Sequence, residues 1–477
     1  MIKANAIREE NKVIHQMKLI FMLAVVLGCT ALHAKEEPKS PWTLHDAAGL
    51  PDWLKFSVEH RTRFEGASNS FRLNTRGGDQ VFAFRTLVFL EAAYEQFRVG
   101  GEFIDSRIEN PTSNTPVNNT QEDDADLLQA YLTWQSKDLL GSGLGAEVKF
   151  GRQTIDLGSR RLVARNAMRN TINSFTGFNF VVNDGERWQW RNFVVLPVNR
   201  LPSDGPLIRN GFVEFDEENF DTIFAGSFLS LQELPLDSLG EIYFYQLSEV
   251  DGPKIQTANR NLSTPGLRWY RKPKTNEFDF ELESALQTGT SRTSTAQTNR
   301  TQLDHFSYFG HVQFGYSFDL PWSPRLLLQY DYASGDADPN DRKNGRFDTL
   351  FGARRFEFGP TGIWGAFARA NINTPGIRLL VNPTDNLKAM IAHRAYWLAE
   401  KRDTWVGSDL RDPNGRSGSF IGQQLEAQLI WNAIPKLITL ETGWAHLFKG
   451  DFAKNAPGAP VDKGDADYFY AQTTFTF

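Results

Sequence analysis

Five arginines crowd the stretch "GRQTIDLGSRRLVARNAMRN", which covers residues 151–170. A guanidinium is planar and permanently charged, and it meets a carboxylate with two parallel hydrogen bonds, so such a cluster suits an anionic ligand. Further arginines lie on the polar face of two strand-like segments near the N-terminus and in a long segment near residue 350. The residues that we predict to contact the ligand are Arg61, Arg63, Arg85, Arg152, Arg160, Arg161, Arg165, Arg169, Arg354 and Arg355.

The same arginines have a structural interpretation. Glu59, Glu91, Glu102 and Asp156 are available as partners, and ion pairs with them would only brace the molecule. An exposed ion pair contributes only about 0.2–1 kcal/mol, so neither interpretation is excluded by energy alone. If the cluster faces a ligand, replacing Arg161 and Arg165 with glutamate should reduce or reverse the preference of the protein for anions.

Other reactive side chains give weaker patterns. "DADPND", residues 336–341, resembles the start of a calcium loop but lacks the glycine and the distal glutamate of that motif. His305 and His311 share one strand face without a third ligand, and Glu281 and Glu283 are neighbours on one strand, which cannot flank a glycosidic bond. We therefore expect no metal site, no cofactor and no catalytic residue.

The elements that position these side chains are β-strands with two different faces. In "HFSYFGHVQFGYSF", residues 305–318, Phe306, Tyr308 and Phe314 alternate with His305 and His311. A period of two is the signature of a strand between an apolar and a polar environment. The alternation recurs in residues 55–64, 277–286, 421–431 and in the last segment, 469–477.

The spacing of these segments distinguishes a barrel from a soluble sandwich. We count eighteen strand-like segments, joined alternately by short and long connections. Transmembrane barrels show this rhythm, with short periplasmic turns and long extracellular loops. The long connections fall near residues 66–80, 109–126, 152–174, 198–218, 249–264, 289–304, 335–371, 400–418 and 449–466. The predicted fold is an all-β, antiparallel transmembrane barrel.

Composition agrees with this fold class. Mean hydropathy is -0.42 and hydrophobic residues make up 40%, which is too polar for a bundle of membrane helices, while 37 phenylalanines suit a β-rich chain. The net charge of -6 is mild, and no nucleic-acid partner is expected. The single cysteine, Cys29, excludes a disulfide within the chain.

An export signal precedes the strands. The apolar stretch 19–32 follows Lys18 and is too short to span a bilayer as a helix, so it predicts a signal peptide of residues 1–34 cleaved after Ala34. Met17 is an alternative start, and "VLGC" is an alternative lipidation site at Cys29. We expect residues 35–52 to form a short periplasmic segment, too short for a plug domain, and residues 53–477 to form the barrel.

The C-terminal strand ends on Phe477, and this terminal aromatic resembles the assembly signal of outer-membrane barrels. With the leader and the strand rhythm, it predicts location in the outer membrane of a Gram-negative-type bacterium, in contact with its lipid.

Two longer motifs resemble the alginate export family of outer-membrane barrels. They are "GRQTIDLGSRRLV" followed by "NSFTGFNF", and "QYDYASGDADPND" followed by "GRFDTLF". The likeness covers roughly residues 53–477. The chain departs from the family pattern at Arg160, where a glycine is usual, so the resemblance leaves the ligand open.

The resemblance implies an eighteen-stranded monomer whose arginine-rich pore conducts an anionic uronate polysaccharide outward, with periplasmic secretion components as partners. Two alternatives stay open at this point. One is an anion-selective porin for uptake of acidic sugars or oligosaccharides, and the other is an outer-membrane barrel enzyme. A fold of this kind hosts several functions.

Overall fold

The computed structural model describes residues 43–113, 115–252 and 256–477. The predicted signal peptide, with the alternative start and the alternative lipidation site, lies outside the described residues. Among the described residues, no helix combines the length and the apolar character needed to cross a membrane.

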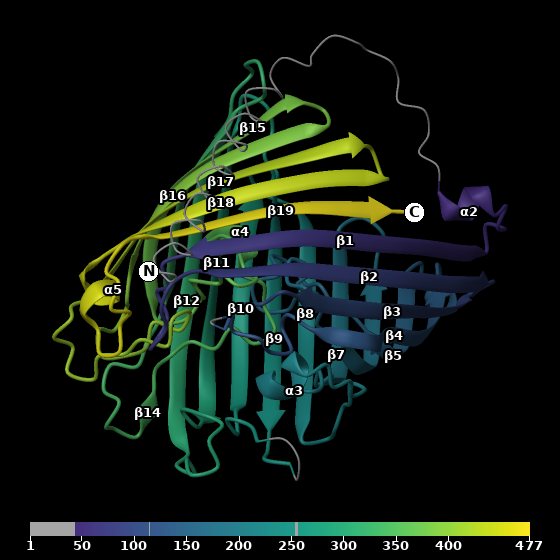
Figure 1. Cartoon of the computed structure of the whole chain (residues 1–477). Coiled ribbons are helices and arrows are strands. Elements are labelled where there is room, and N and C mark those ends of the chain that lie inside the picture. The colour runs from purple at the N-terminus through teal and green to yellow at the C-terminus, as the bar shows by residue number, and fades with distance from the viewer. Residues whose placement is uncertain (1–42, 114, 253–255) are drawn as a thin grey trace.

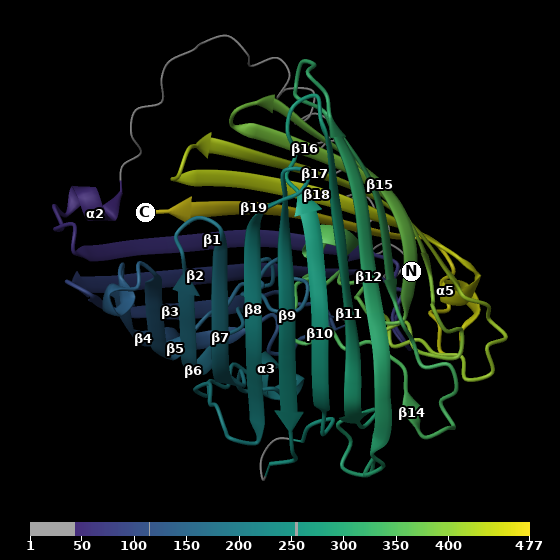
Figure 2. The ribbon, with the colours of Figure 1, turned by 180° about the vertical axis from the view of Figure 1, so that it is seen from behind.

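One antiparallel sheet closes on itself to form a barrel (Figures 1 and 2). Each wall strand is hydrogen-bonded to the next along the chain, and β1 (Leu54–Ser68) pairs with the final strand, β19 (Ala466–Thr476), from Glu59–Thr476 to Ser68–Asp467. Closure leaves no edge strand, which is what a membrane requires because lipid cannot satisfy free backbone groups. The prediction of an eighteen-stranded barrel is confirmed.

Between β1 and β19 the wall contains β2 (Asp79–Tyr94), β3 (Phe97–Glu109), β4 (Asp123–Ser136), β5 (Gly145–Gln153), β6 (Phe175–Asn183), β7 (Trp188–Pro197), β8 (Thr222–Leu234), β9 (Ser238–Glu249), β10 (Asn261–Arg271), β11 (Phe278–Ser291), β12 (Leu303–Ser317), β13 (Arg325–Ala333), β15 (Ile372–Thr384), β16 (Leu387–Trp397), β17 (Phe420–Ile434) and β18 (Ile438–Lys449). The remaining strand, β14 (Lys343–Asn344), is a two-residue stretch of a loop that pairs in parallel with β12.

The connections carry the short helices. They are α2 (Leu44–Ala47) before the barrel, the 3-10 turn Leu139–Gly141, α3 (Gly205–Arg209), α4 (Arg355–Phe358) and α5 (Asp451–Asn455). The long connections leave one end of the barrel, the long-loop end, and the short turns leave the other.

The alternation of side chains along β12 is as the sequence predicts. Phe306 and Phe314 are exposed on the outside of the wall, at 59% and 55%, whereas His305 and His311 are buried toward the lumen. Each strand contributes apolar side chains to the exterior of the barrel and polar side chains to its interior, because successive side chains point to opposite faces.

Two long loops fold back into the lumen and join there. We call them together the plug: the β5–β6 loop (residues 154–174) and the β13–β15 loop (residues 334–371). Val163 and Phe351 form a parallel bridge, and the N–H of Phe351 donates to the carbonyl of Leu162 at 3.0 Å. The backbones approach so closely that a side chain on Gly352 would collide with the carbonyl of Arg161, so only glycine fits there.

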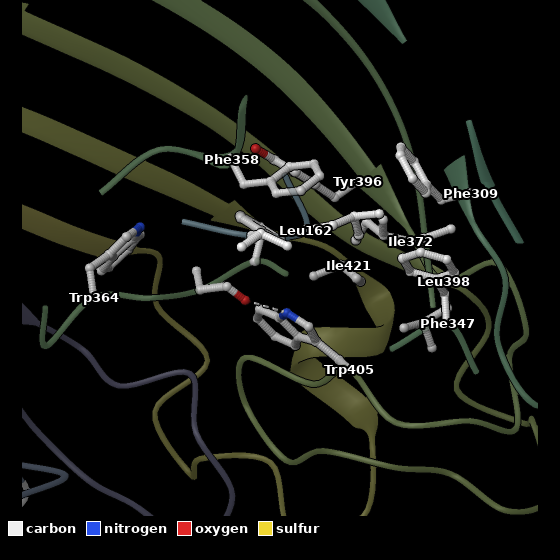
Figure 3. Packing of buried hydrophobic residues seen from close by; sticks show 14 of the residues in the cluster. Leu162, Phe309, Phe347, Phe358, Trp364, Ile372, Tyr396, Leu398, Trp405 and Ile421 are labelled. Carbon is white, nitrogen blue, oxygen red and sulfur yellow. Dashed lines mark hydrogen bonds between the residues drawn. The ribbon is translucent and has the colours of Figure 1, made fainter. Parts of the chain in front are cut away.

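The plug has an apolar core that it shares with the inner wall (Figure 3). Trp364 and Phe358 of the plug pack among side chains from well-separated strands, including Phe309 of β12 and Tyr396 of β16. Trp405, from the β16–β17 loop, donates its indole N–H to the carbonyl of Ala366 at 2.7 Å. Because the core includes wall and loop residues alike, the plug is a packed part of the fold.

Candidate ligand path

Three arginines of the β1–β2 wall hold the plug from one side. Arg61, Arg63 and Arg85 donate to the carbonyl oxygens of residues 167–169, with shortest distances of 2.7–2.9 Å. Arg85 also pairs with Glu59 at 2.8 Å. These guanidinium groups are buried and directed at backbone carbonyls, so they fix the plug against the wall.

Arg161 holds the plug from the opposite side. Its guanidinium lies between Glu281 and Glu283 of β11 and Glu357 of α4, 2.5 Å from Glu283 and 2.8 Å from Glu357. Glu357 is shared with Arg369 at 2.8 Å. With a side chain only 4% exposed, Arg161 is the hub of a buried ionic network that joins both loops of the plug to the wall.

Two more arginines of the cluster are paired. Arg165 meets Glu102 of β3 at 2.7 Å, while its backbone N–H donates to Asp156. Arg152 has the outward parity of Phe150 on β5 and pairs with Glu218 of the β7–β8 loop at 2.5 Å. Arg152 therefore bridges the end of β4 and the β7–β8 loop, although the sequence groups it with the plug arginines.

A cavity of about 490 Å³ lies on the short-turn side of the plug. Its walls come from the plug and from β1, β2, β17, β18 and β19. Arg160 is exposed there, its guanidinium 4.1 Å from the ring of Phe356. The predicted ligand residues that line this cavity are Arg61, Arg85, Arg160, Arg165 and Arg355, and the carboxylates that line it are Glu59, Asp156 and Glu441.

A second cavity, of about 300 Å³, lies within the plug and differs in its charge. We call it the arginine cavity, because Arg169, Arg200, Arg354 and Arg369 line it and none of its lining residues is acidic. Two of these arginines were predicted from the sequence. A concave site lined by four guanidinium groups and by no acidic residue is suited to an anion.

The partners of these arginines show which charges are uncompensated: Arg369 is paired with Glu357, whereas Arg169 and Arg354 have no acidic partner among the described residues. Arg354 has no hydrogen bond or ion pair to its side chain from any residue that the structure describes, and Arg169 donates only to the amide oxygen of Asn173. Arg200 donates to the carbonyls of Asn119 and Ile172 at 2.8 and 3.2 Å. Burial, with the neighbouring Arg200 and Arg354, lowers the pKa of Arg169 well below its ordinary value, and burial alone lowers that of Arg354.

The cavities follow one another through the lumen. The arginine cavity shares Asn166 and Ala353 with the 490 Å³ cavity, and it shares Asn173, Arg200 and Phe351 with a vestibule of about 650 Å³ at the long-loop end. Of the ten predicted arginines, only Arg63, Arg152 and Arg161 line none of these three spaces.

Sequence reasoning missed two residues of the arginine cavity, Arg200 and Arg369. Arg200 stands alone in "PVNRLP" and Arg369 in "FARAN", so neither belongs to a cluster or to an alternating strand. Arg200 closely follows β7, and Arg369 closely precedes β15. Their position next to the end of a wall strand was the signal that could have identified them.

Asp123, Asp126 and Asp216 are the one group of the described residues that brings three carboxylate oxygens within 4.8 Å of each other. Asp126 accepts the backbone N–H of Asp216 at 2.5 Å and lies 3.5 Å from Arg152. These contacts anchor the β7–β8 loop to β4.

A closed barrel with an apolar exterior and a chain of polar cavities through its lumen defines the chain as an outer-membrane channel protein. The family comparison agrees, since the alginate export family matches residues 52–466, and the chain belongs to that family. A comparison with curated proteins finds no match.

Solved structures share this fold, among them that of an outer membrane protein of Pseudomonas aeruginosa. OpdK of Pseudomonas aeruginosa with vanillate is 12% identical, with a TM-score of 0.57, over 89% of this chain and 98% of that one. OccAB3 of Acinetobacter baumannii is 12% identical (TM-score 0.56, 89% and 99% covered), and P. aeruginosa OccK2 in complex with glucuronate is 10% identical (TM-score 0.54, 89% and 98% covered). At these identities the likeness shows the fold.

Proposed function

We propose that this protein is a passive outer-membrane channel for small carboxylate-bearing molecules of the uronate class, with the arginine cavity as its recognition site. The observation that carries the proposal is the presence of four arginines, and of no acidic residue, around that cavity. A carboxylate entering it supplies the counter-charge that Arg169 and Arg354 do not receive from the protein.

The size of the cavity favours a small ligand. Its volume of about 300 Å³ is at the lower end of the range of about 300–1,000 Å³ typical of small-molecule sites. Larger spaces on both sides, of about 650 and 490 Å³, supply an entrance and an exit. OccK2, which shares the fold, is a glucuronate complex, and this supports the same ligand class.

Weak binding fits conduction. A channel needs a site that attracts the solute yet releases it, and several arginines in succession offer the carboxylate a new partner before it leaves the last one. Arg160 and Arg355, in the 490 Å³ cavity, are the next two along the path.

The second candidate is export of an anionic polysaccharide, and the family description favours it. A polymer must thread the lumen continuously, so it requires the plug loops to move apart at their backbone contacts, among them the 2.8 Å bond from Ala353 to the carbonyl of Arg160.

Planar-bilayer recordings separate the two candidates. A small-molecule channel is expected to be anion-selective, to pass glucuronate as a charge carrier and to be insensitive to polyguluronate. Long blockades by the polymer, with no measurable glucuronate current, would instead support polysaccharide passage. Equal permeability to potassium and chloride would contradict both.

A further inference from the structure

The β7–β8 loop, residues 198–221, exposes an apolar surface. It contains α3, which lies near the long-loop end of the barrel (Figures 1 and 2). Phe215 is 75% exposed and Phe220 is 84% exposed, and Leu207, Phe212 and Val213 are exposed as well. So many large apolar side chains on one loop indicate contact with something other than water.

An ion pair at the end of the β4–β5 ladder positions this loop. Phe150 of β5 faces outward and contacts Phe178 of β6, with the two rings tilted and their centroids 4.5 Å apart. Arg152, two residues further along β5, has the same parity. It donates to the carbonyl of Asp216 at 3.1 Å and to the carboxylate of Glu218 at 2.5 Å. Residues 216–218 therefore lie against the C-terminal end of β5.

The loop also covers a stretch of β4 that β5 leaves unpaired. The β4–β5 ladder ends at Ala130, whereas β4 begins seven residues earlier, at Asp123. Along that stretch the backbone N–H of Asp216 in the loop donates to the carboxylate of Asp126. The guanidinium of Arg152 donates to the carbonyl of Leu127 at 3.0 Å. The loop thus takes the place of missing wall at this point of the rim.

The exposed apolar side chains of the loop lie outside the ligand path, whereas Val198 and Leu201 at its start line the vestibule. None of residues 204–221 lines the vestibule, the arginine cavity or the 490 Å³ cavity. This part of the loop makes polar contacts with the rest of the protein. The backbone N–H of Asp216 donates to the carboxylate of Asp126, and the guanidinium of Arg209 donates to the carbonyl of Thr115 at 2.6 Å. The polar groups are directed to the protein, and the phenylalanines are left on the other side.

We propose that the β7–β8 loop lies in the outer leaflet of the membrane and inserts Phe212, Phe215 and Phe220 at the boundary between headgroups and acyl chains. Its apolar surface continues the lipid-facing belt of the adjacent strands, where Val194 and Ile223 are exposed. The exposed carboxylate of Glu214 lies between Phe212 and Phe215 and keeps the loop at that boundary, because burying an unpaired charge deeper in lipid is costly. Aromatic side chains favour this zone.

Spin labels at single cysteines test the proposal, in a chain whose only native cysteine is replaced (Cys29→Ser). The protein is reconstituted in vesicles of phosphatidylethanolamine and phosphatidylglycerol, and labels are placed by Phe215→Cys and Phe220→Cys. Collisions with oxygen, which concentrates in lipid, are compared with collisions with a water-soluble nickel chelate. Leu267→Cys, on the lipid-facing side of β10, and Val461→Cys, in the exposed β18–β19 loop, are the matched references.

We expect the labels at 215 and 220 to show an oxygen-to-nickel collision ratio several-fold above that at 461 and approaching that at 267. A ratio at both sites equal to that at 461 would overturn the proposal and would leave the surface for a soluble partner or a second copy. Because all four native side chains are exposed, the labels displace no packed residue, and heat-modifiable electrophoretic mobility verifies that each barrel is folded.

Discussion

Replacing Arg354 with glutamine removes one of the four charges of the arginine cavity without breaking a bond that the described residues make to that side chain. Glutamine keeps much of the volume and stays polar, so the plug is expected to remain folded. The change therefore acts on the ligand path rather than on stability.

The size of the effect follows from the charge alone. Two unit charges about 4 Å apart interact by about 1 kcal/mol in bulk water and by about 4 kcal/mol near a protein surface. The cavity is open to solvent through its neighbours, so we expect a loss of about 1–2 kcal/mol for a passing carboxylate. Since about 1.4 kcal/mol is a factor of ten, the anion-to-cation permeability ratio should fall by about 5–30-fold.

Reversal potentials across a planar bilayer under a salt gradient give this ratio directly. Arg416→Gln is the matched control, because it also removes one positive charge from the protein but lies exposed in the β16–β17 loop and lines none of the three cavities. If Arg354→Gln and Arg416→Gln give the same reversal potential as the unmodified protein, the arginine cavity does not govern selectivity and the reasoning fails.

Three further outcomes are expected. Gly352→Ala should force the two plug loops apart at a cost of about 1–3 kcal/mol, seen as larger and noisier single-channel currents. Arg161→Gln removes the cation shared by Glu281, Glu283 and Glu357, leaves the buried Glu283 without a close cation, and should lower the free energy of unfolding by about 3–5 kcal/mol, measured by thermal denaturation in detergent. Burial, with Asp123 and Asp126, raises the pKa of Asp216 to about 8, so the native loop retains a proton that the unfolded chain has already lost above its ordinary pKa. Attachment of the β7–β8 loop should therefore weaken as the pH rises from about 4 to about 8 and level off above that, with faster cleavage of the loop by added protease, and Asp216→Asn should remove this dependence.

The wall of the barrel was predictable from the sequence because each strand reports its own environment. In residues 305–318 the apolar side chains face lipid and the polar ones face the lumen, and no distant residue is needed to decide this. The number of wall strands followed from the same local signal, counted along the chain.

The plug was not predictable in the same way. The sequence showed that residues 152–174 and 335–371 were long connections, but a loop has no period that says whether it enters the lumen. Their junction depends on contacts such as Asn173 to the carbonyl of Phe351, which are 178 positions apart. Only the three-dimensional closure of the barrel brings these residues together.

The partners of individual arginines were beyond the sequence for the same reason. Arg161 and Arg165 looked equivalent, and substituting both by glutamate was expected to reverse the preference for anions. In the structure Arg161 binds Glu281, Glu283 and Glu357, so a glutamate there would add a fourth carboxylate to a buried group and disrupt the plug before any selectivity could be measured.

The arginines of this channel protein therefore fall into two groups that composition cannot separate. Arg61, Arg63 and Arg161 are directed at carbonyls or carboxylates of the protein, whereas Arg169 and Arg354 have neither an acidic partner nor a wall to brace. Neutralising a member of the first group removes a partner that buried acceptors need, so the cost appears as lost stability. Neutralising a member of the second group leaves the fold as it is and weakens only the attraction for an anion, so the cost appears as lost selectivity. If a single substitution of Arg169 or Arg354 lowered both stability and selectivity, the same residues would serve both the packing of the plug and the recognition of the anion.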